Sequence, residues 1–155
     1  MQKNYEPKEF EKNIYQSWLN KKYFHADADS KKPHFSVVMP PPNVTGQLHI
    51  GHALNDTIQD ILVRYKRMKG FDTLWLPGTD HAAIATEAKV VEAITNEGKT
   101  KEEIGREEFV KLGWDWYEKY GNRICEQLQG LGVSCDWDRK AFTMDDNLNR
   151  AVKHV

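Results

Sequence analysis

Two histidines three residues apart, His49 and His52, stand in the stretch "PPPNVTGQLHIGHALND" at residues 40–56. In the first turn of a helix, residues three apart lie on the same face. A helix N-terminus also offers unbonded N–H groups and a positive dipole, which suit a phosphate group. Imidazoles there can donate hydrogen bonds to charge that develops in a transition state. Gly46 and Gly51 let a ligand approach the backbone closely, so the stretch predicts a phosphate site.

A second stretch, "PGTDHA" at residues 77–82, places Asp80 and His81 directly after an apolar segment. Ligands of open α/β sheets bind beyond the carboxyl ends of the strands, so we expect Asp80 at the same edge as the histidine pair. Its carboxylate could accept a substrate ammonium group. It could equally cap a helix that begins near Ala82. The residues alone favour neither interpretation.

A metal site is the alternative chemistry, because imidazole and carboxylate groups are zinc ligands. The four candidate ligands would be His49, His52, Asp80 and His81. The H-x-x-H spacing is a weak signal, since the glutamate of HExxH is absent. The phosphate motifs GxGxxG and GxxxxGK[ST] are absent too. We therefore expect no metal ligands at this site and keep a metal-dependent hydrolase as the alternative function.

The elements that must position these residues follow from the apolar periodicity. The segment "HFSVVM" (34–39) predicts a buried strand ended by prolines, and "DTLWLPG" (72–78) predicts a second strand. Helical patterns cover about 50–69, about a dozen residues from 82, and 107–129. Strands alternating with helices indicate an α/β fold, here a parallel sheet with flanking helices that resembles half of a doubly wound domain.

Three local expectations accompany this fold. The helix at 50–69 has an apolar face that we expect to be Leu54, Ile58, Ile61, Leu62 and Tyr65. The basic run at 64–69 is expected to be a solvated helix end, where cations suit the dipole. Thr100 and Glu103 fit a capping box. The aromatic stripe along 107–129 is interpreted as core packing, and it consists of Phe109, Leu112, Trp116, Tyr120, Ile124 and Leu128.

The composition limits the class of protein. The 155 residues include 22 basic and 23 acidic ones, with a net charge of −1, so no overall positive field attracts nucleic acid. No apolar run approaches the roughly 18 residues of a membrane span, and the first residues do not resemble a signal peptide. Two cysteines make no disulfide framework. We expect a cytoplasmic protein without a membrane partner.

The "HIGH" tetrapeptide at 49–52, placed after a proline-rich strand exit, resembles the signature of class I aminoacyl-tRNA synthetases. The whole of 40–86 closely resembles the valyl members of this family, and 105–146 resembles the part that follows. The resemblance implies the N-terminal half of a Rossmann-like catalytic domain. It also implies activation of valine to valyl-adenylate and transfer to tRNA(Val), with ATP and Mg²⁺, by a full-length enzyme that is a monomer.

The resemblance implies roles for individual residues as well. His49 and His52 match the catalytic histidines, which stabilise the phosphates. The implied ATP-binding residues are Asn43, Thr45, Gly46, His49, Gly51 and His52. The implied valine-binding residues are Pro41, Pro42, Asn43 and Asp80, of which Asp80 holds the amino group. Ala83 and Glu87 stand where the family often has glycine and glutamine.

The domain organisation is expected to follow the same family. Residues 1–33 are expected to form an N-terminal helix and loop, and 34–155 the first half of the nucleotide-binding catalytic domain, truncated at the C-terminus. The second family motif, KMSKS, is absent, so we expect a fragment that is weakly active or inactive alone. A non-catalytic protein that kept this half for binding stays open as a further alternative.

Overall fold

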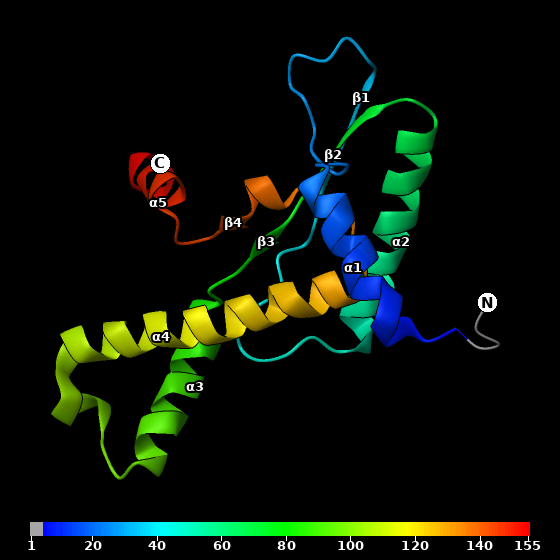
Figure 1. Ribbon diagram of the computed structural model, residues 1–155. Coiled ribbons are helices and arrows are strands. Elements are labelled where there is room, and N and C mark those ends of the chain that lie inside the picture. The colour runs from blue at the N-terminus through cyan, green and yellow to red at the C-terminus, as the bar shows by residue number, and fades with distance from the viewer. Residues whose placement is uncertain (1–4) are drawn as a thin grey trace. The chain divides into compact units, whose positions relative to one another are not determined.

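The computed structural model describes residues 5–155 (Figure 1). Its elements, in chain order, are α1 (Pro7–Asn20), β1 (His34–Val38), α2 (Ile50–Met68), β2 (Asp72–Leu76), β3 (Gly78–Thr79), α3 (Ala83–Asn96), α4 (Lys101–Gly130), η1 (Trp137–Arg139), β4 (Ala141–Phe142) and α5 (Asp146–His154). Both strand pairs are parallel, which confirms the predicted α/β class. None of the described helices is long and apolar enough to cross a membrane.

The chain divides into two compact units, and each unit combines segments that are distant in sequence. The first unit contains Met1–Met39, Ala53–Pro77 and Leu128–Lys140, and the second contains Pro40–His52, Gly78–Gln127 and Ala141–Val155. All predicted site residues belong to the second unit. The predicted domain division between residues 33 and 34 stays a prediction.

In the first unit, β1 and β2 pair in parallel from His34 opposite Asp72 to Val38 opposite Leu76. The predicted strand is confirmed, but its predicted burial is wrong, since Val38 is 68% exposed. Among the described strands, β1 pairs only with β2. The other edge of β1 therefore has no strand partner among the described residues. The residues of β1 alternate between exposed and half-buried, whereas Trp75 of β2 is fully buried.

Helix α2 has the predicted bounds but not the predicted buried face. The expected core residues are exposed, Leu54 by 63%, Ile58 by 53% and Ile61 by 61%, and Leu62 and Tyr65 are exposed as well. The buried side chains of the helix are Asp56 and Val63. The helix carries apolar residues on more than one side, so the residues packed around it decide which side is buried.

The basic end of α2 is not a solvated helix end, which corrects the prediction. Arg64 donates a hydrogen bond to the carbonyl of Gly132 at 2.6 Å. Arg67 donates to both the hydroxyl and the carbonyl of Ser134 at 2.7 Å. Burial lowers the pKa of Arg67. These cations serve as hydrogen-bond donors to a loop 65 or more residues away, because a guanidinium can satisfy several oxygens at once.

Helix α1 is hydrogen-bonded to the same loop, at Val133 and Trp137. The hydroxyl of Tyr15 donates to the carbonyl of Val133 at 2.7 Å and accepts from the indole N–H of Trp137 at 2.8 Å. Tyr15 is the buried residue of α1, and burial raises the pKa of its phenol. A buried hydroxyl needs such partners, so this pair of bonds fixes α1 against the loop.

In the second unit, α3 and α4 cover the segments where helical patterns were predicted. The capping box is confirmed: Glu103 accepts from the backbone N–H of Thr100 at 2.8 Å, and the Thr100 hydroxyl accepts from the N–H of Glu103 at 3.3 Å. Helix α4 is interrupted at Gly105, whose φ of 75° favours glycine. Of the predicted stripe, Ile124 is fully buried, as is Leu128, which belongs to the first unit, and the other four residues are half-buried.

Candidate active site

The strand exit and the "PGTDHA" stretch are joined by backbone hydrogen bonds. The N–H of Val44 donates to the carbonyl of Asp80, and the N–H of Asp80 donates to the carbonyl of Pro42, both at 2.9 Å. These two bonds form a parallel bridge between Asn43 and Asp80. The bridge places Asp80 beside the proline-rich loop, and its predicted place at the same edge as the histidine pair stays a prediction.

His49 and His52 cap the N-terminus of α2 reciprocally. Nδ1 of His49 accepts from the backbone N–H of Gly51 at 3.1 Å, and Nδ1 of His52 accepts from the backbone N–H of His49 at 3.3 Å. The arrangement resembles a capping box, with imidazoles in place of hydroxyl and carboxylate, except that His49 accepts from the second helical residue and not from the third. The ring centroids lie 4.0 Å apart, which confirms that the two side chains meet.

The cap determines which nitrogen of each ring can bind a ligand. An unprotonated Nδ1 accepts these bonds, so the proton of each neutral ring is on Nε2, which remains as a donor. Burial, and next the charge of His49, lower the pKa of His52. A Cβ at position 51 would lie 2.9 Å from the His49 ring. Gly51 therefore lets this ring fold over the backbone.

Helix α4 holds the loop between the strand exit and the histidines. The indole of Trp116 donates to the carbonyl of Val44 at 2.8 Å, and the side-chain oxygen of Gln127 accepts from the N–H of Leu48 at 3.0 Å. Neither role follows from the sequence, where Trp116 belongs to the stripe interpreted as core packing. The available signal was that a half-buried indole N–H needs an acceptor.

The Asp80 carboxylate does not cap α3, because the N-cap of this helix is Ala82 and receives no side-chain cap hydrogen bond, so the predicted capping role is wrong. Its Oδ1 accepts from the N–H of Ala82 at 3.0 Å and from the hydroxyl of Thr143 at 3.1 Å. Asp80 thus binds the backbone just before α3. No residue in the described range 5–155 donates to Oδ2, and the side chain is 36% exposed. The second oxygen can therefore accept a bond from a ligand.

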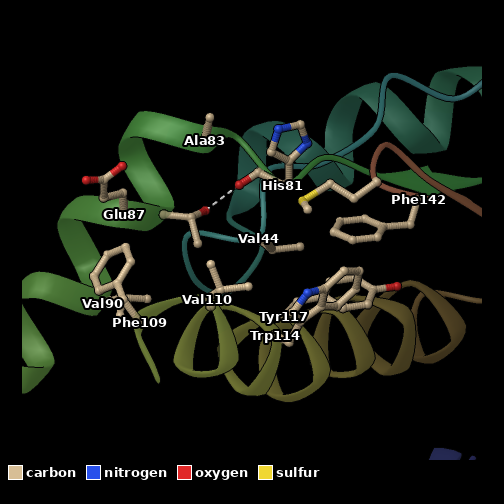
Figure 2. Close-up of a pocket in the computed structure, with 13 residues that line it drawn as sticks. Val44, His81, Ala83, Glu87, Val90, Phe109, Val110, Trp114, Tyr117 and Phe142 are labelled. Carbon is tan, nitrogen blue, oxygen red and sulfur yellow. Dashed lines mark hydrogen bonds between the residues drawn. The ribbon is translucent and has the colours of Figure 1, made fainter. Parts of the chain in front are cut away.

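An apolar cavity of about 260 Å³ lies beside this edge, between α3 and α4 (Figure 2). One wall is aromatic: the rings of Tyr117 and Phe142 stack with centroids 3.7 Å apart, and Trp114 meets Phe142 edge-on. Val44 and His81 contribute to the lining. The predicted valine-binding residues are not part of it, so the cavity is not assigned to valine.

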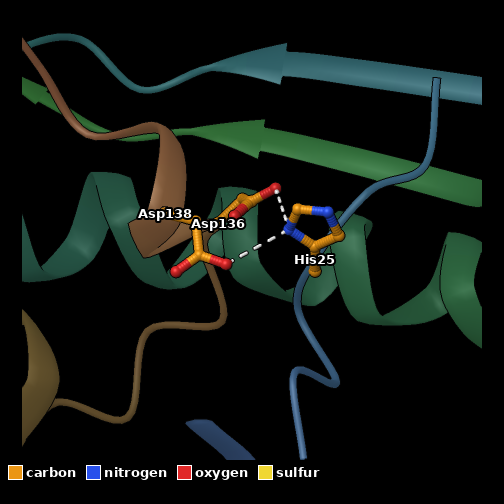
Figure 3. Close-up of side chains that lie close together, drawn as sticks. All are labelled: His25, Asp136 and Asp138. Carbon is orange, nitrogen blue, oxygen red and sulfur yellow. Dashed lines mark ion pairs between the residues drawn. The ribbon is translucent and has the colours of Figure 1, made fainter.

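The expected absence of metal ligands at the histidine pair stays a prediction. Within residues 5–155, the side chains whose ligand atoms converge to within 4.8 Å are instead His25, Asp136 and Asp138 (Figure 3). Nδ1 of His25 lies 3.5 Å from Asp136 Oδ2 and 3.4 Å from Asp138 Oδ2. Arg139 and Lys22 pair with these same two oxygens. A divalent cation would have to displace both cations, so we interpret this group as an ion-pair network.

Known proteins are similar to this chain over nearly its whole length. A family model described as tRNA synthetases class I (I, L, M and V) matches residues 13–155. Valine--tRNA ligase of Carboxydothermus hydrogenoformans is 59% identical over 97% of this chain and 17% of the relative. Valine--tRNA ligase of Fusobacterium nucleatum is 54% identical over 100% of this chain and 18% of the relative. The chain thus spans less than a fifth of the length of these curated relatives.

A solved structure supports the fold. The crystal structure of the ternary complex of Agrobacterium radiobacter agnB2 LeuRS with tRNA and LeuAMS superimposes with a TM-score of 0.73 at 22% identity. The match covers 94% of this chain and 17% of that chain. The predicted Rossmann-like fold is therefore confirmed.

Proposed function

This chain belongs to the class I tRNA synthetase family, and we propose that it supplies part of the active site of a valine--tRNA ligase. The substrates are valine, ATP and tRNA(Val), and the complete enzyme acts as a monomer in the cytoplasm. The observation that carries the proposal is the Asn43–Asp80 bridge, which joins the histidine loop to a carboxylate with one unbonded oxygen. The names of the relatives support the choice of amino acid.

The reaction is adenylation followed by acyl transfer. A carboxylate oxygen of valine attacks the α-phosphorus of ATP, the new P–O bond forms, and the bond to the bridging oxygen breaks as pyrophosphate leaves. A terminal hydroxyl of the tRNA then attacks the acyl carbon, and AMP leaves. Because the substrate supplies the nucleophile, the protein contributes positioning and charge stabilisation.

The histidine loop stabilises the phosphates in this proposal. The Nε2–H groups of His49 and His52 donate to phosphate oxygens as negative charge shifts toward the leaving pyrophosphate. Burial lowers the pKa of His52, which favours the neutral ring. The N-terminus of α2 adds its dipole. The ATP side of the loop consists of Asn43, Thr45, Gly46 and Gly51.

The valine side of the proposal centres on Asp80. Its Oδ2 accepts from the substrate ammonium group, and this charge-assisted bond is stronger than a neutral one. Pro41, Pro42 and Asn43 shape the pocket beside it. The backbone N–H of Val44 donates to the carbonyl of Asp80, and the N–H of Asp80 donates to the carbonyl of Pro42. These two bonds hold Asp80 beside this segment.

Magnesium fits the substrate better than it fits these residues. Mg²⁺ prefers oxygen ligands and commonly binds through substrate phosphates. Residues 40–52 include no carboxylate, and the two histidines offer nitrogen donors. Mg²⁺ therefore enters with ATP, where it would neutralise phosphate charge, and no step of the proposal uses a protein-bound ion.

The test is a chimera in which this chain replaces the corresponding segment of the Carboxydothermus hydrogenoformans relative. We expect valine-dependent exchange of pyrophosphate into ATP and charging of tRNA(Val). His52→Gln should lower the exchange rate by about 10²-fold, a typical loss for one transition-state donor. His34→Gln, at the exposed start of β1, is the matched control. A folded chimera that activates another amino acid, or none, would contradict the proposal.

A further inference from the structure

A single hydroxyl, that of Thr143, contacts both residues of the Asp80–His81 pair. It donates to Asp80 Oδ1 at 3.1 Å and accepts from the backbone N–H of His81 at 3.0 Å. Nδ1 of His81 is hydrogen-bonded to the same oxygen. Thr143 lies 63 residues after Asp80 in the chain, so no sequence motif links them.

The hydrogen-bonding capacity of the hydroxyl fixes the direction of each bond. A threonine hydroxyl has one proton and two acceptor sites. An ionised carboxylate only accepts, so the proton must point toward Asp80. The backbone N–H of His81 fills one acceptor site of Thr143. Nδ1 of His81 can then bond only by donating, which requires the proton of a neutral His81 ring to be on Nδ1.

The backbone around Thr143 is held independently of these side chains. Strand β4 pairs in parallel with β3, Gly78 opposite Ala141 and Thr79 opposite Phe142. The N–H of Thr143 donates to the carbonyl of Thr79 at 3.2 Å. The Phe142 ring, 3% exposed, is stacked against α4. The paired backbone of β4 therefore places the Thr143 hydroxyl beside Asp80.

We propose that Thr143 is a positioning residue for amino-acid recognition. It holds Oδ1 of Asp80 and the Nδ1–H form of His81, which leaves Asp80 Oδ2 oriented for the ammonium group of the substrate. This role rests on the proposed function, since it concerns the same amino-acid site. Thr143 itself touches no reacting atom in this scheme, and its effect passes through Asp80.

The first test uses this chain alone and does not depend on catalysis. ¹⁵N NMR of the histidine rings, at a pH about two units above the ordinary histidine pKa of about 6.5, reports which nitrogen is protonated. His81→Gln identifies the signal. We expect an Nδ1–H ring in the wild type and in Thr143→Ser, and a smaller fraction of that form in Thr143→Val, where Asp80 Oδ1, 3.4 Å from Nδ1, is the remaining acceptor. An Nε2–H ring for His81 in the wild type would overturn the proposal, and this outcome requires only that the wild type and His81→Gln fold.

The second test uses the chimera and separates positioning from folding. Thr143→Val should raise the KM for valine about tenfold, as expected for a lost bond to a charged group, and leave the KM for ATP unchanged. Thr143→Ser should restore the KM. In the Asp80→Asn variant, adding Thr143→Val should change the KM for valine by less than about twofold further, because the effects of coupled residues are not additive. Thr95→Val, which removes a hydroxyl bonded within α3, is the control.

The outcomes distinguish the two proposals. An equal rise in the KM for ATP, or full additivity with Asp80→Asn, would refute positioning by Thr143 while the ligase function stands. A chimera without valine activation, combined with the Nδ1–H ring of His81, would refute the ligase function while the hydrogen-bond assignment stands.

Discussion

Replacing Trp116 with phenylalanine should loosen the loop that carries the histidine pair. The indole N–H donates to the carbonyl of Val44 at 2.8 Å, and Val44 is fully buried. Within the described part of the chain, no other group donates to this oxygen. Phenylalanine keeps a ring to pack on Tyr120, whose centroid lies 4.4 Å away, but leaves the carbonyl without a partner.

The cost follows from that buried carbonyl. An unsatisfied buried polar group costs about 1–3 kcal/mol, which for a chain of this size corresponds to a fall in Tm of roughly 2–4 °C per kcal/mol. The matched control is Trp114→Phe, because Trp114 is 42% exposed and its indole N–H makes no hydrogen bond to any described residue. The control reports the cost of the smaller ring alone.

Urea unfolding of the chain, followed by far-UV circular dichroism, measures both variants. We expect Trp116→Phe to lose about 1–3 kcal/mol more free energy of unfolding than Trp114→Phe. Equal losses would show that the Val44 carbonyl finds another partner, and would refute the idea that α4 holds the loop through this bond.

Three further predictions concern charged groups. Burial raises the pKa of Asp56 above its ordinary 3.8, so ionisation of this carboxyl weakens the fold as pH rises. Asp56→Asn should therefore be more stable than the wild type at pH 7, and this gain should vanish below pH 3.8. Thermal melts at both pH values measure the difference. Arg67→Lys should lose about 1–3 kcal/mol in urea unfolding, because an ammonium cannot reach both oxygens of Ser134; an unchanged midpoint would count against this role. His49→Gln should raise the pKa of His52 without restoring its ordinary value, since burial, the larger cause, remains; NMR titration of the His52 ring measures this, and an unmoved pKa would contradict the coupling.

Much of the local structure was determined by residues three or four positions apart. The capping box of Thr100 and Glu103 and the meeting of His49 with His52 were both predicted from spacing and both observed. Gly70, two residues after α2, has a φ of 84°, a conformation that favours glycine. Such features depend on the geometry of one helical turn, which the adjacent residues specify. The family, too, was recognisable from short motifs.

The tertiary structure decided what lies far apart in the chain. Periodicity indicated an apolar face on α2, yet Val63 is buried and Leu54 is exposed, because burial depends on what packs against the helix. The hydroxyl of Thr143 reaches Asp80 only through the parallel pairing of β3 with β4. Contacts across 60 or more residues depend on strand register and helix packing, and neither is specified by residues adjacent in sequence.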